Sequence, residues 1–342
     1  MKAKDIRGAP ALLSICVPAY NGLPHLIGLL DQILSCKSLA FEVVVSDDAS
    51  SDGTWAYLVS RAIDEPRLRV YLNDQNLGMD RNFATAVSLA YGRFVWLCGQ
   101  DDLISPEGIG YVLDLLRDDS VDFVYMNHTV KLENNVVPVI ARYHSFDADK
   151  RGEGLADFLK ITGGSLPTFL PTYIIRKTLW DSVDVTRYFN TYYVQAGVFL
   201  EVAQKIRWIA VSQVYVVGLV LSNGWQENTR RYANIIVGYF LMINRVSKKS
   251  PFCESYIKME QYRQHFLMLV FALLNCRREN IQLDAERLSE LRNSLGGSRL
   301  QKLSIDWLLK SPRMVVVSAW MILNIVRGVR HAIARTGSII RL

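Results

Sequence analysis

The sequence predicts an α/β fold built on a largely parallel sheet, followed by a helical C-terminal region. From Leu12 to Met126, short apolar runs alternate with segments of helical periodicity, which is typical of a parallel sheet covered on both faces. After Gly224 the strand-like runs stop, and the apolar residues recur at helical spacing. We therefore expect an α/β domain over residues 1–225 and a helical region over residues 226–342.

Each predicted strand is an unbroken apolar run of strand length, as expected for a strand buried on both faces. In chain order these runs are Leu12–Val17, Phe41–Ser46, Leu68–Leu72, Phe94–Cys98, Val121–Met126, Phe169–Ile175 and Trp208–Leu221. Between residues 129 and 166 the pattern loosens around four glycines, which indicates a variable segment beside a site.

Helices are predicted between the strands, where apolar residues recur every three or four positions. In the first half these are Leu23–Leu34, Gly53–Ile63, Arg81–Ala90 and Pro106–Arg117, the last with proline in its first turn. In the C-terminal region they are Tyr232–Val246, Phe252–Cys276, Asp284–Leu295 and Ile305–Arg335.

Composition and charge exclude several classes of protein. The chain has 342 residues, enough to bury a large core without disulfides or structural metals. Its five scattered cysteines have no metal-ligand spacing, and we interpret them as reduced thiols in a cytoplasmic protein. The first ten residues lack the apolar core of a signal peptide. Basic residues are not interleaved with aromatic ones, so no nucleic-acid partner is expected.

Polar residues follow four of the predicted strands where each strand ends. These clusters are Pro18–Gly22, Asp47–Thr54, Asn73–Asn82 and Gly99–Asp102. Ligands of an open parallel sheet bind beyond the carboxyl ends of its strands. The four clusters therefore predict a single site at one edge of the sheet.

Asp101 and Asp102 follow the fourth apolar run after Gly99 and Gln100. Two adjacent carboxylates repel one another unless a cation neutralises them, and Mg²⁺ or Mn²⁺ prefers such oxygen ligands together with substrate phosphates. By themselves the two acids would equally suit the start of the next helix, whose dipole favours negative charge. With the other three clusters, the metal interpretation is the better one.

Asp47 and Asp48 are suited to accept hydrogen bonds from a base or ribose, although Asp-Asp-Ala-Ser-Ser-Asp-Gly-Thr is also a good turn sequence. Arg81 is suited to a phosphate, or else to a solvated helix surface. No GxGxxG follows the first strand and no GxxxxGK[ST] is present, which disfavours dinucleotide oxidoreductases and P-loop phosphotransferases.

Two stretches near the N-terminus carry a family resemblance. Ser-Ile-Cys-Val-Pro-Ala-Tyr-Asn at residues 14–21 and Val-Ser-Asp-Asp-Ala-Ser-Ser-Asp-Gly-Thr at residues 45–54 resemble the opening of family 2 glycosyltransferases of GT-A fold. Asn-Leu-Gly-Met-Asp-Arg-Asn-Phe at residues 76–83 and Val-Trp-Leu-Cys-Gly-Gln-Asp-Asp at residues 95–102 resemble the abequosyltransferase-like branch that builds bacterial O-antigen. The resemblance is specific to about residue 110 and weak beyond residue 230.

The resemblance implies transfer of a sugar, in this branch a deoxyhexose, from a nucleotide-sugar donor to a glycan carried on polyprenyl pyrophosphate. It implies a divalent metal, Mg²⁺ or Mn²⁺, at Asp101 and Asp102. It also implies a nucleotide pocket formed by Pro18, Ala19, Tyr20, Asn21, Asp47, Asp48 and Arg81.

The sequence departs from the family pattern in two places. The family's Asp-x-Asp motif aligns with Gly-Gln-Asp or Gln-Asp-Asp at residues 99–102, so one usual carboxylate is missing. Residues 192–197 lack the acidic base that inverting members carry, which leaves Glu201 as the nearest candidate and both inversion and retention open. Asp147, Asp149 and Glu227 are weaker candidates.

Arg230 is a candidate to bind the departing pyrophosphate, although a solvated position at a helix start explains it equally well.

The C-terminal tail combines an apolar stretch with basic residues. Met314–Val326 is too short to span a bilayer, which needs roughly 20 residues. Residues 299–342 contain eight Lys or Arg and one acid, which gives them a net charge of +7. We expect an interfacial helix at the cytoplasmic face of the inner membrane, in preference to a helix packed on the α/β domain.

Two other functions remain open from the sequence. A nucleotidyltransferase would share the metal and the α/β nucleotide site. A non-catalytic membrane scaffold that retains the fold would explain the missing base.

Overall fold

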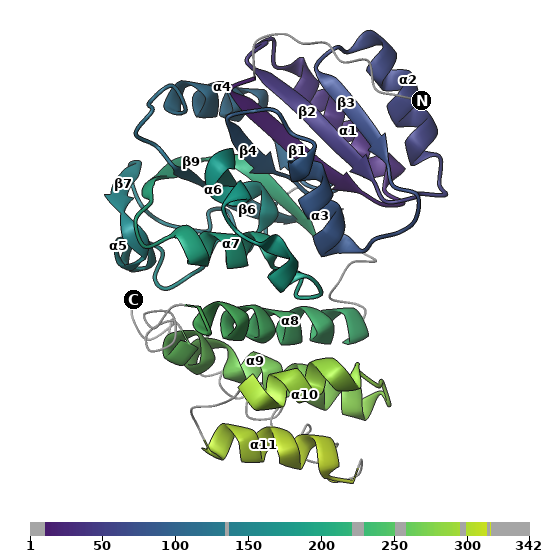
Figure 1. Cartoon of the computed structure of the whole chain (residues 1–342), viewed down its shortest axis with the longest axis vertical. Helices are drawn as coiled ribbons and strands as arrows, with labels where there is room; N and C mark the ends of the chain where they lie inside the picture. Colours follow the sequence, from purple (N-terminus) through teal and green to yellow (C-terminus); the bar gives the residue numbers. More distant parts are fainter. Residues whose placement is uncertain are drawn as a thin grey trace.

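The computed structural model describes residues 11–133, 137–220, 229–249, 258–294, 299–312 and 315. Within them, one nine-stranded mixed sheet has the strand order β3-β2-β1-β4-β8-β6-β9-β5, with β7 paired to β9 (Figure 1). Two apolar cores lie against the sheet: one includes residues of α1 and α4, and the other residues of α3, α5 and α7. The predicted α/β class is confirmed.

The N-terminal half of the sheet is parallel and follows the predicted alternation. Strands β1 (Leu13–Ala19), β2 (Phe41–Asp47), β3 (Leu68–Leu72) and β4 (Phe94–Leu97) are parallel neighbours, connected by α1 (Leu23–Ser35), α2 (Thr54–Asp64) and α3 (Met79–Ser88). Every residue of β1 and β2 is buried, which is why these strands are continuous apolar runs and do not alternate.

The second half of the sheet is mixed. Its elements are β5 (Leu103–Ile104), α4 (Pro106–Leu115), β6 (Phe123–Leu132), β7 (Lys150–Glu153), α5 (Gly154–Ile161), β8 (Tyr173–Arg176), α6 (Lys177–Asp181), α7 (Val194–Val202) and β9 (Arg207–Val220). Strand β8 is antiparallel to both β4 and β6, whereas β6 and β9 are parallel.

Two local expectations in this half differ from the structure. Strand β8 starts at Tyr173, because Leu170–Thr172 form a 3₁₀ turn around Pro171. The segment from 129 to 166, expected to be irregular, contains β7 and α5. These two elements are short, and a four-residue strand is too brief for its periodicity to be detected in the sequence.

The C-terminal helices are α8 (Thr229–Ser247), α9 (Lys258–Arg278), α10 (Ala285–Ser294) and α11 (Arg299–Lys310). Figure 1 shows α8 beneath the sheet domain, with α11 furthest from the sheet. Helix α8 packs on α7, and Phe240, Leu273 and Ile305 belong to the same apolar core as Phe199. The expected boundary at residue 225 lies outside the described residues and stays a prediction.

The expectation of one helix over Ile305–Arg335 is wrong, because α11 ends at Lys310 and is followed by Ser311 and Pro312. A proline disfavours the helical conformation of the residue before it, which accounts for this end. Apart from Val315, the apolar stretch Met314–Val326 lies outside the described residues. Among the helices that are described, none is both long and apolar enough to cross a bilayer.

The described cysteines are free thiols, as expected. Cys16, Cys98 and Cys276 are buried, and Cys36 is partly buried.

Candidate active site

Four polar loops meet at one edge of the sheet, because β3, β2, β1 and β4 are parallel and their carboxyl ends lie together. These loops comprise residues 20–22, 48–53, 73–78 and 98–102. The sheet topology therefore brings together the clusters that the sequence placed at strand ends.

Asn21 connects the loop after β1 to the loop after β2. Its backbone N–H donates to Ser50 Oγ at 2.9 Å, and its Oδ1 accepts from the backbone N–H of Ser51 at 2.8 Å. Asn21 has a φ of +45°, in the left-handed region that asparagine tolerates better than most residues. This side chain thus fixes the shape of the loops.

Gln100 connects the loop after β1 to the loop after β4. Its Oε1 accepts from the backbone N–H of Tyr20 at 2.8 Å, and its Nε2 donates to the Tyr20 carbonyl at 3.0 Å. A Cβ at Gly22 would lie 2.2 Å from the Gln100 amide carbon, so any larger residue there would displace the Gln100 side chain. The residue at the position of the missing carboxylate is therefore a structural connection between two loops.

The carboxylate of Asp48 is buried and occupied by protein donors. It accepts from Asn73 Nδ2 at 2.9 Å, from the backbone N–H of Leu77 at 2.8 Å and from that of Gly78 at 3.0 Å. Asp48 thereby holds the loop after β3 against the loop after β2. Its predicted contact with the nucleoside stays a prediction.

Asp47 differs from its neighbour because one of its oxygens is unoccupied. Its Oδ1 accepts from the backbone N–H and hydroxyl of Ser50, whereas its Oδ2 is buried without a partner among the described residues. Burial raises the pKa of this carboxyl, opposed by the Ser50 hydrogen bonds. An unpartnered buried acceptor at the sheet edge is suited to a ligand donor.

Pro18 and Ala19 contribute backbone shape to the site. They lie in register with Ser46 and Asp47 of β2, and both are buried. The Ala19 carbonyl accepts from the backbone N–H of Asp48 at 2.8 Å. Tyr20, the next residue, has a half-exposed side chain at the edge of the site.

Arg81 lies in the first turn of α3, and its side chain is exposed. Its guanidinium lies 4.6 Å from the ring centroid of Phe189, a cation–π geometry. No salt bridge to Arg81 is present among the described residues. The phenyl ring thus orients a cation that remains available to an anionic ligand.

Asp80, next to Arg81, anchors the segment that contains Phe189. Its buried Oδ2 accepts from the backbone N–H groups of Thr191 and Tyr192, both at 2.8 Å. Burial raises the pKa of Asp80 to about 6, opposed by these hydrogen bonds. This contact connects the start of α3 to the start of α7.

Asp101 and Asp102 lie together over Gly99. A Cβ at Gly99 would be 2.6 Å from Asp102 Oδ2 and 3.1 Å from Asp101 Oδ1, so a larger residue there would displace the two carboxylates. Burial, and then the neighbouring Asp101 charge, raise the pKa of Asp102 well above its usual range. Burial also raises the pKa of Asp101, opposed by His25. Neutralisation by a cation would relieve both effects.

These two carboxylates fit a divalent cation that shares its ligands with a nucleotide. No cluster of three or more His, Cys, Asp or Glu side chains with metal-site geometry occurs among the described residues. A Mg²⁺ site commonly consists of one or two carboxylates, substrate phosphates and water, so a pair is sufficient.

Glu201 lies near the opposite end of α7 from the site edge. Seven residues separate it from Val194, about 10 Å along the helix axis. Its carboxylate accepts from Arg187 at 3.1 Å and from the Tyr188 hydroxyl at 2.5 Å. These contacts hold a structural ion pair, and a role for Glu201 as catalytic base stays a prediction.

The remaining candidates have separate surroundings. Arg230 is exposed in the first turn of α8, where its charge acts on Cys276 of α9. Asp149 accepts from the Tyr111 hydroxyl at 2.6 Å and from the backbone N–H of Ser212 at 2.8 Å, so it holds β9. Glu227 lies outside the described residues.

Sequence reasoning missed Gln100, Asp80 and Phe189 as site residues. Gln100 and Asp80 lie inside clusters already singled out, but their partners are 80 and more than 100 positions away in the chain. Phe189 is one aromatic residue among many, and no local signal could have assigned it to Arg81.

Comparison with known proteins identifies the family of the N-terminal half. Residues 14–163 match the family Glycosyl transferase family 2. Over 206 residues the chain is 29% identical to abequosyltransferase RfbV of Salmonella typhimurium, covering 56% of this chain and 61% of that protein. It is 25% identical over 126 residues to WfgD of Escherichia coli, a UDP-Glc:α-D-GlcNAc-diphosphoundecaprenol β-1,3-glucosyltransferase, covering 37% of this chain and 49% of that protein.

The fold is shared with a solved glycosyltransferase structure. S. aureus TarS 1–349 in complex with UDP superposes with a TM-score of 0.60 at 18% identity, covering 86% of both chains. Residues 14–163 thus match family 2 glycosyltransferases, and the fold of the chain is the GT-A fold.

Proposed function

We propose that this protein transfers a sugar from a nucleotide-sugar donor to a glycan carried on polyprenyl pyrophosphate, in the assembly of a bacterial surface polysaccharide. The observation that carries this proposal is the placement of the unpartnered Asp47 oxygen and the Asp101–Asp102 pair at one edge of the sheet. The Asp47 oxygen can accept a hydrogen bond from a nucleoside, and the Asp101–Asp102 pair can bind a metal ion that carries the pyrophosphate. The names of the two bacterial relatives support the substrate class.

In the proposed donor complex, Asp47 accepts a hydrogen bond from the base or ribose. Pro18, Ala19, Tyr20 and Asn21 form the adjoining wall, whose shape Gln100 and Ser50 maintain. Arg81, oriented by Phe189, faces the phosphates, and Asp48 acts by holding the loop that precedes α3.

Asp101 and Asp102 would hold Mg²⁺ or Mn²⁺. A bound divalent ion supplies charge neutralisation of the nucleoside-diphosphate leaving group. In this chain the carboxylates of Asp101 and Asp102 are held over Gly99. That of Asp102 also accepts a hydrogen bond from the Leu219 backbone.

Helix α7 starts with Val194 and Gln195 at the site edge, and neither is an acid. Glu201 is therefore the one residue that we predict as a catalytic base. Sugar transfer at this site is compatible with either inversion or retention of the anomeric configuration.

We place the protein peripherally at the cytoplasmic face of the inner membrane, where such lipid-linked acceptors are assembled. The positive charge of residues 299–342 supports this location, because it attracts anionic headgroups.

A thermal-shift screen against CDP, UDP, GDP and dTDP, each with Mn²⁺, Mg²⁺ or EDTA, tests the donor site. Binding to the native state raises the apparent melting temperature by mass action, so one nucleotide should give a metal-dependent shift. Absence of any shift would favour a non-catalytic scaffold, and release of inorganic pyrophosphate from a sugar phosphate and nucleoside triphosphate would identify a nucleotidyltransferase.

Two variants separate the metal site from the fold. Asp101→Asn and Asp102→Asn should abolish transfer and the metal dependence of the nucleotide shift. Neither variant should lower the melting temperature without ligand, because each replaces a buried charge by a neutral group of the same shape. Wild-type turnover by both variants would remove the metal from the proposal.

A further inference from the structure

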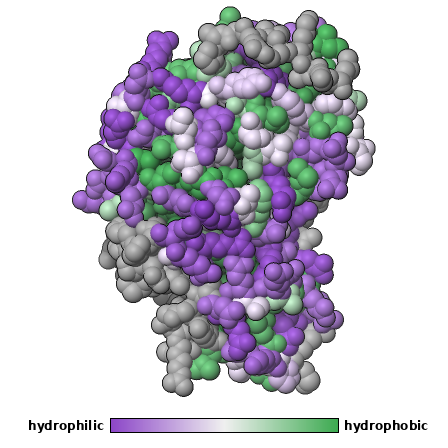
Figure 2. Space-filling model, viewed as in Figure 1, coloured by the Kyte–Doolittle hydropathy of each residue, from purple (hydrophilic) through white to green (hydrophobic). Residues whose placement is uncertain are grey.

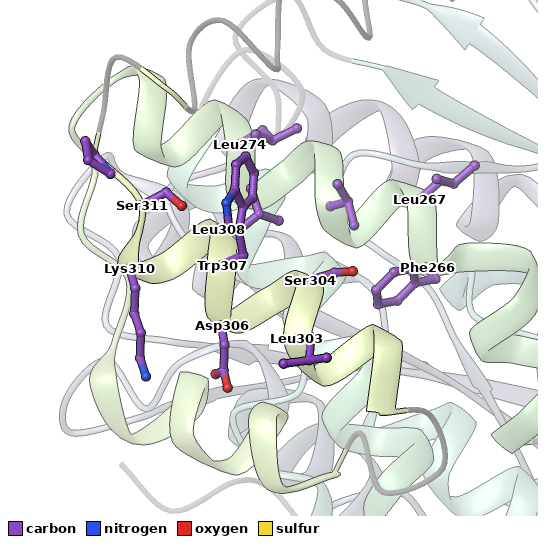
Figure 3. A pocket seen from close by; sticks show the side chains of 12 residues that line it. Phe266, Leu267, Leu274, Leu303, Ser304, Asp306, Trp307, Leu308, Lys310 and Ser311 are labelled. Carbon is purple, nitrogen blue, oxygen red and sulfur yellow. The ribbon is translucent and has the colours of Figure 1, made fainter.

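An apolar groove lies between α9 and α11, in the helical region furthest from the sheet (Figure 1). Its volume is about 950 Å³, near the upper end of the range of small-molecule pockets. Its walls are side chains at helical spacing on two facing helices, shown in Figure 3. Those of α9 are Phe266, Leu267, Val270 and Leu274, and those of α11 include Leu303, Trp307 and Leu308.

Large apolar side chains around this groove remain exposed to solvent. Leu267 is 63% exposed, Leu303 56% and Trp307 47%, and Met268 beside them is 42% exposed. Figure 2 shows apolar residues reaching the surface over these helices at the lower end of the molecule. A contiguous exposed apolar surface marks an interaction site in a folded protein.

Two charged side chains, Asp306 and Lys310, are among the described residues that line the groove. Asp306, the acidic residue of α11, pairs with Arg292 of α10 at 2.6 Å. In Figure 3, Asp306 and Lys310 extend away from the ring of Trp307. The groove therefore presents hydrocarbon walls, with a cationic side chain at its margin.

The sequence that begins with α11 and continues to residue 342 is strongly basic. Residues 299–342 have eight Lys or Arg against Asp306, a net charge of +7, whereas the rest of the chain is near −1. A second copy docked through the same surface would bring two such basic segments together, which is unfavourable. Anionic lipid headgroups would instead be attracted to these positive charges.

We propose that the groove between α9 and α11 takes a hydrocarbon chain of an anionic phospholipid and so seats this end of the molecule on the bilayer. Trp307, with its apolar ring and its N–H, lies at the depth of the headgroups, where tryptophan is favoured. Lys310, at the margin of the groove, contacts the lipid phosphates. This inference rests on the peripheral location proposed above and gives it a binding surface that is separate from the donor site.

Vesicle flotation of the full chain tests this proposal. Wild-type protein should float with vesicles of phosphatidylcholine mixed with phosphatidylglycerol, and weakly with phosphatidylcholine alone. Leu303→Glu combined with Trp307→Glu should weaken the partition coefficient at least about tenfold, equivalent to 1.4 kcal/mol. The matched control is Ile63→Glu on α2, where an apolar residue that is even more exposed (78%) lies in the sheet domain and flotation should not change.

A second readout does not depend on charged substitutions. Brominated lipid chains should quench tryptophan fluorescence of the wild type more than that of Trp307→Phe, since the difference reports Trp307 alone. Equal quenching of the two, or equal flotation of the wild type and the double variant, would overturn the proposal.

Vesicle flotation and the nucleotide-induced thermal shift, measured on the same protein samples, distinguish lipid binding in the groove from the proposed transferase function. The double variant should retain the wild-type nucleotide-induced thermal shift, which shows that its fold and donor site are intact. A wild-type dimer that Leu303→Glu dissociates, without any binding to vesicles, would assign the groove to a second copy and reject the lipid. Flotation without a nucleotide shift would support the groove while rejecting the transferase.

Discussion

Asp47 and Asp48 are neighbours in the chain, yet their carboxylates have different surroundings. All the donors around Asp48 come from the protein, whereas one oxygen of Asp47 has none among the described residues. The difference arises because successive residues at the end of a strand face opposite sides. Asp48 thus shapes the loop, whereas Asp47 is available to a ligand.

Exchange of each of these two aspartates for asparagine should separate the two roles. Asp47→Asn should weaken nucleotide binding about tenfold or more, since a hydrogen bond to a charged group contributes about 1.5–3 kcal/mol, and should leave the melting temperature unchanged. Asp48→Asn should lower the melting temperature, because an amide cannot accept from all three donors. Thermal shifts with and without nucleotide measure both, and a loss of stability in Asp47→Asn alone would contradict this assignment.

The free energy of unfolding should depend on pH through Asp80. Its pKa is about 6 in the folded protein against an ordinary value of 3.8, so the folded state holds its proton more tightly than the unfolded state. This contribution to stability is full below about pH 4 and is lost as the pH rises through about 6. At about 1.4 kcal/mol for each pH unit, the loss amounts to about 3 kcal/mol.

The melting temperature of Asp80→Asn is the comparison that isolates this effect, since the amide does not titrate. Between pH 4 and 7 the wild type should lose stability relative to the variant. The charges of Arg245 and Arg287 act near Asp80 and are constant over this range. Parallel pH profiles of the two proteins would show that Asp80 does not titrate in this window.

At the scale of elements, the segment between the 3₁₀ turn Val185–Tyr188 and α7 connects the C-terminal helices to the donor site. Arg245 of α8 donates to the carbonyls of Arg187 and Phe189 at 3.0 and 2.9 Å, and pairs with Glu290 of α10 at 2.6 Å. Phe189 in turn lies against Arg81. The helical region therefore holds one wall of the donor site in place.

Arg245→Ala should destabilise the protein by about 1.5–3 kcal/mol, because it removes a partly buried ion pair with Glu290 and two charged hydrogen bonds to carbonyl groups. Since Phe189 loses its anchor, the same change should also weaken nucleotide binding. The control is Arg117→Ala, whose pairing with Asp114 is largely solvent-exposed and should contribute little. Calorimetry and nucleotide titration measure the two effects, and wild-type affinity in Arg245→Ala would show that the segment does not shape the donor site.

At the scale of the whole molecule, the sheet domain and the C-terminal helices share one apolar core. Phe199 of α7, Phe240 of α8, Leu273 of α9 and Ile305 of α11 belong to the same buried cluster. Separation of the sheet domain from the C-terminal helices would expose apolar surface to water. Each Å² so exposed lowers the stability of the fold by about 25 cal/mol.

Scanning calorimetry should accordingly show a single unfolding transition for the full chain. Leu273→Ala, a change far from the sheet, should lower that one transition without splitting it, with a cost of about 2–5 kcal/mol for a buried leucine. Two resolved transitions, of which only one moves in this variant, would instead establish independent domains.

The sequence by itself determined the elements and the edge of the sheet where the site lies. Apolar runs report burial on both faces, and parallel strands place all their carboxyl ends together, so the loops could be located from local pattern alone. It also determined that Asp101 and Asp102 stand side by side at the end of β4. These features depend on short-range periodicity.

Only the tertiary structure decided which polar groups are occupied and which are available. The Gln100–Tyr20 hydrogen bonds, the contact of Arg81 with Phe189 and the anchoring of Thr191 by Asp80 join residues from 80 to more than 100 positions apart. Such pairings depend on how elements pack, and a hydrophobic pattern records that a residue is buried without recording its partner. The groove beside α11 arises for the same reason, because helix packing places Trp307 and Phe266 together.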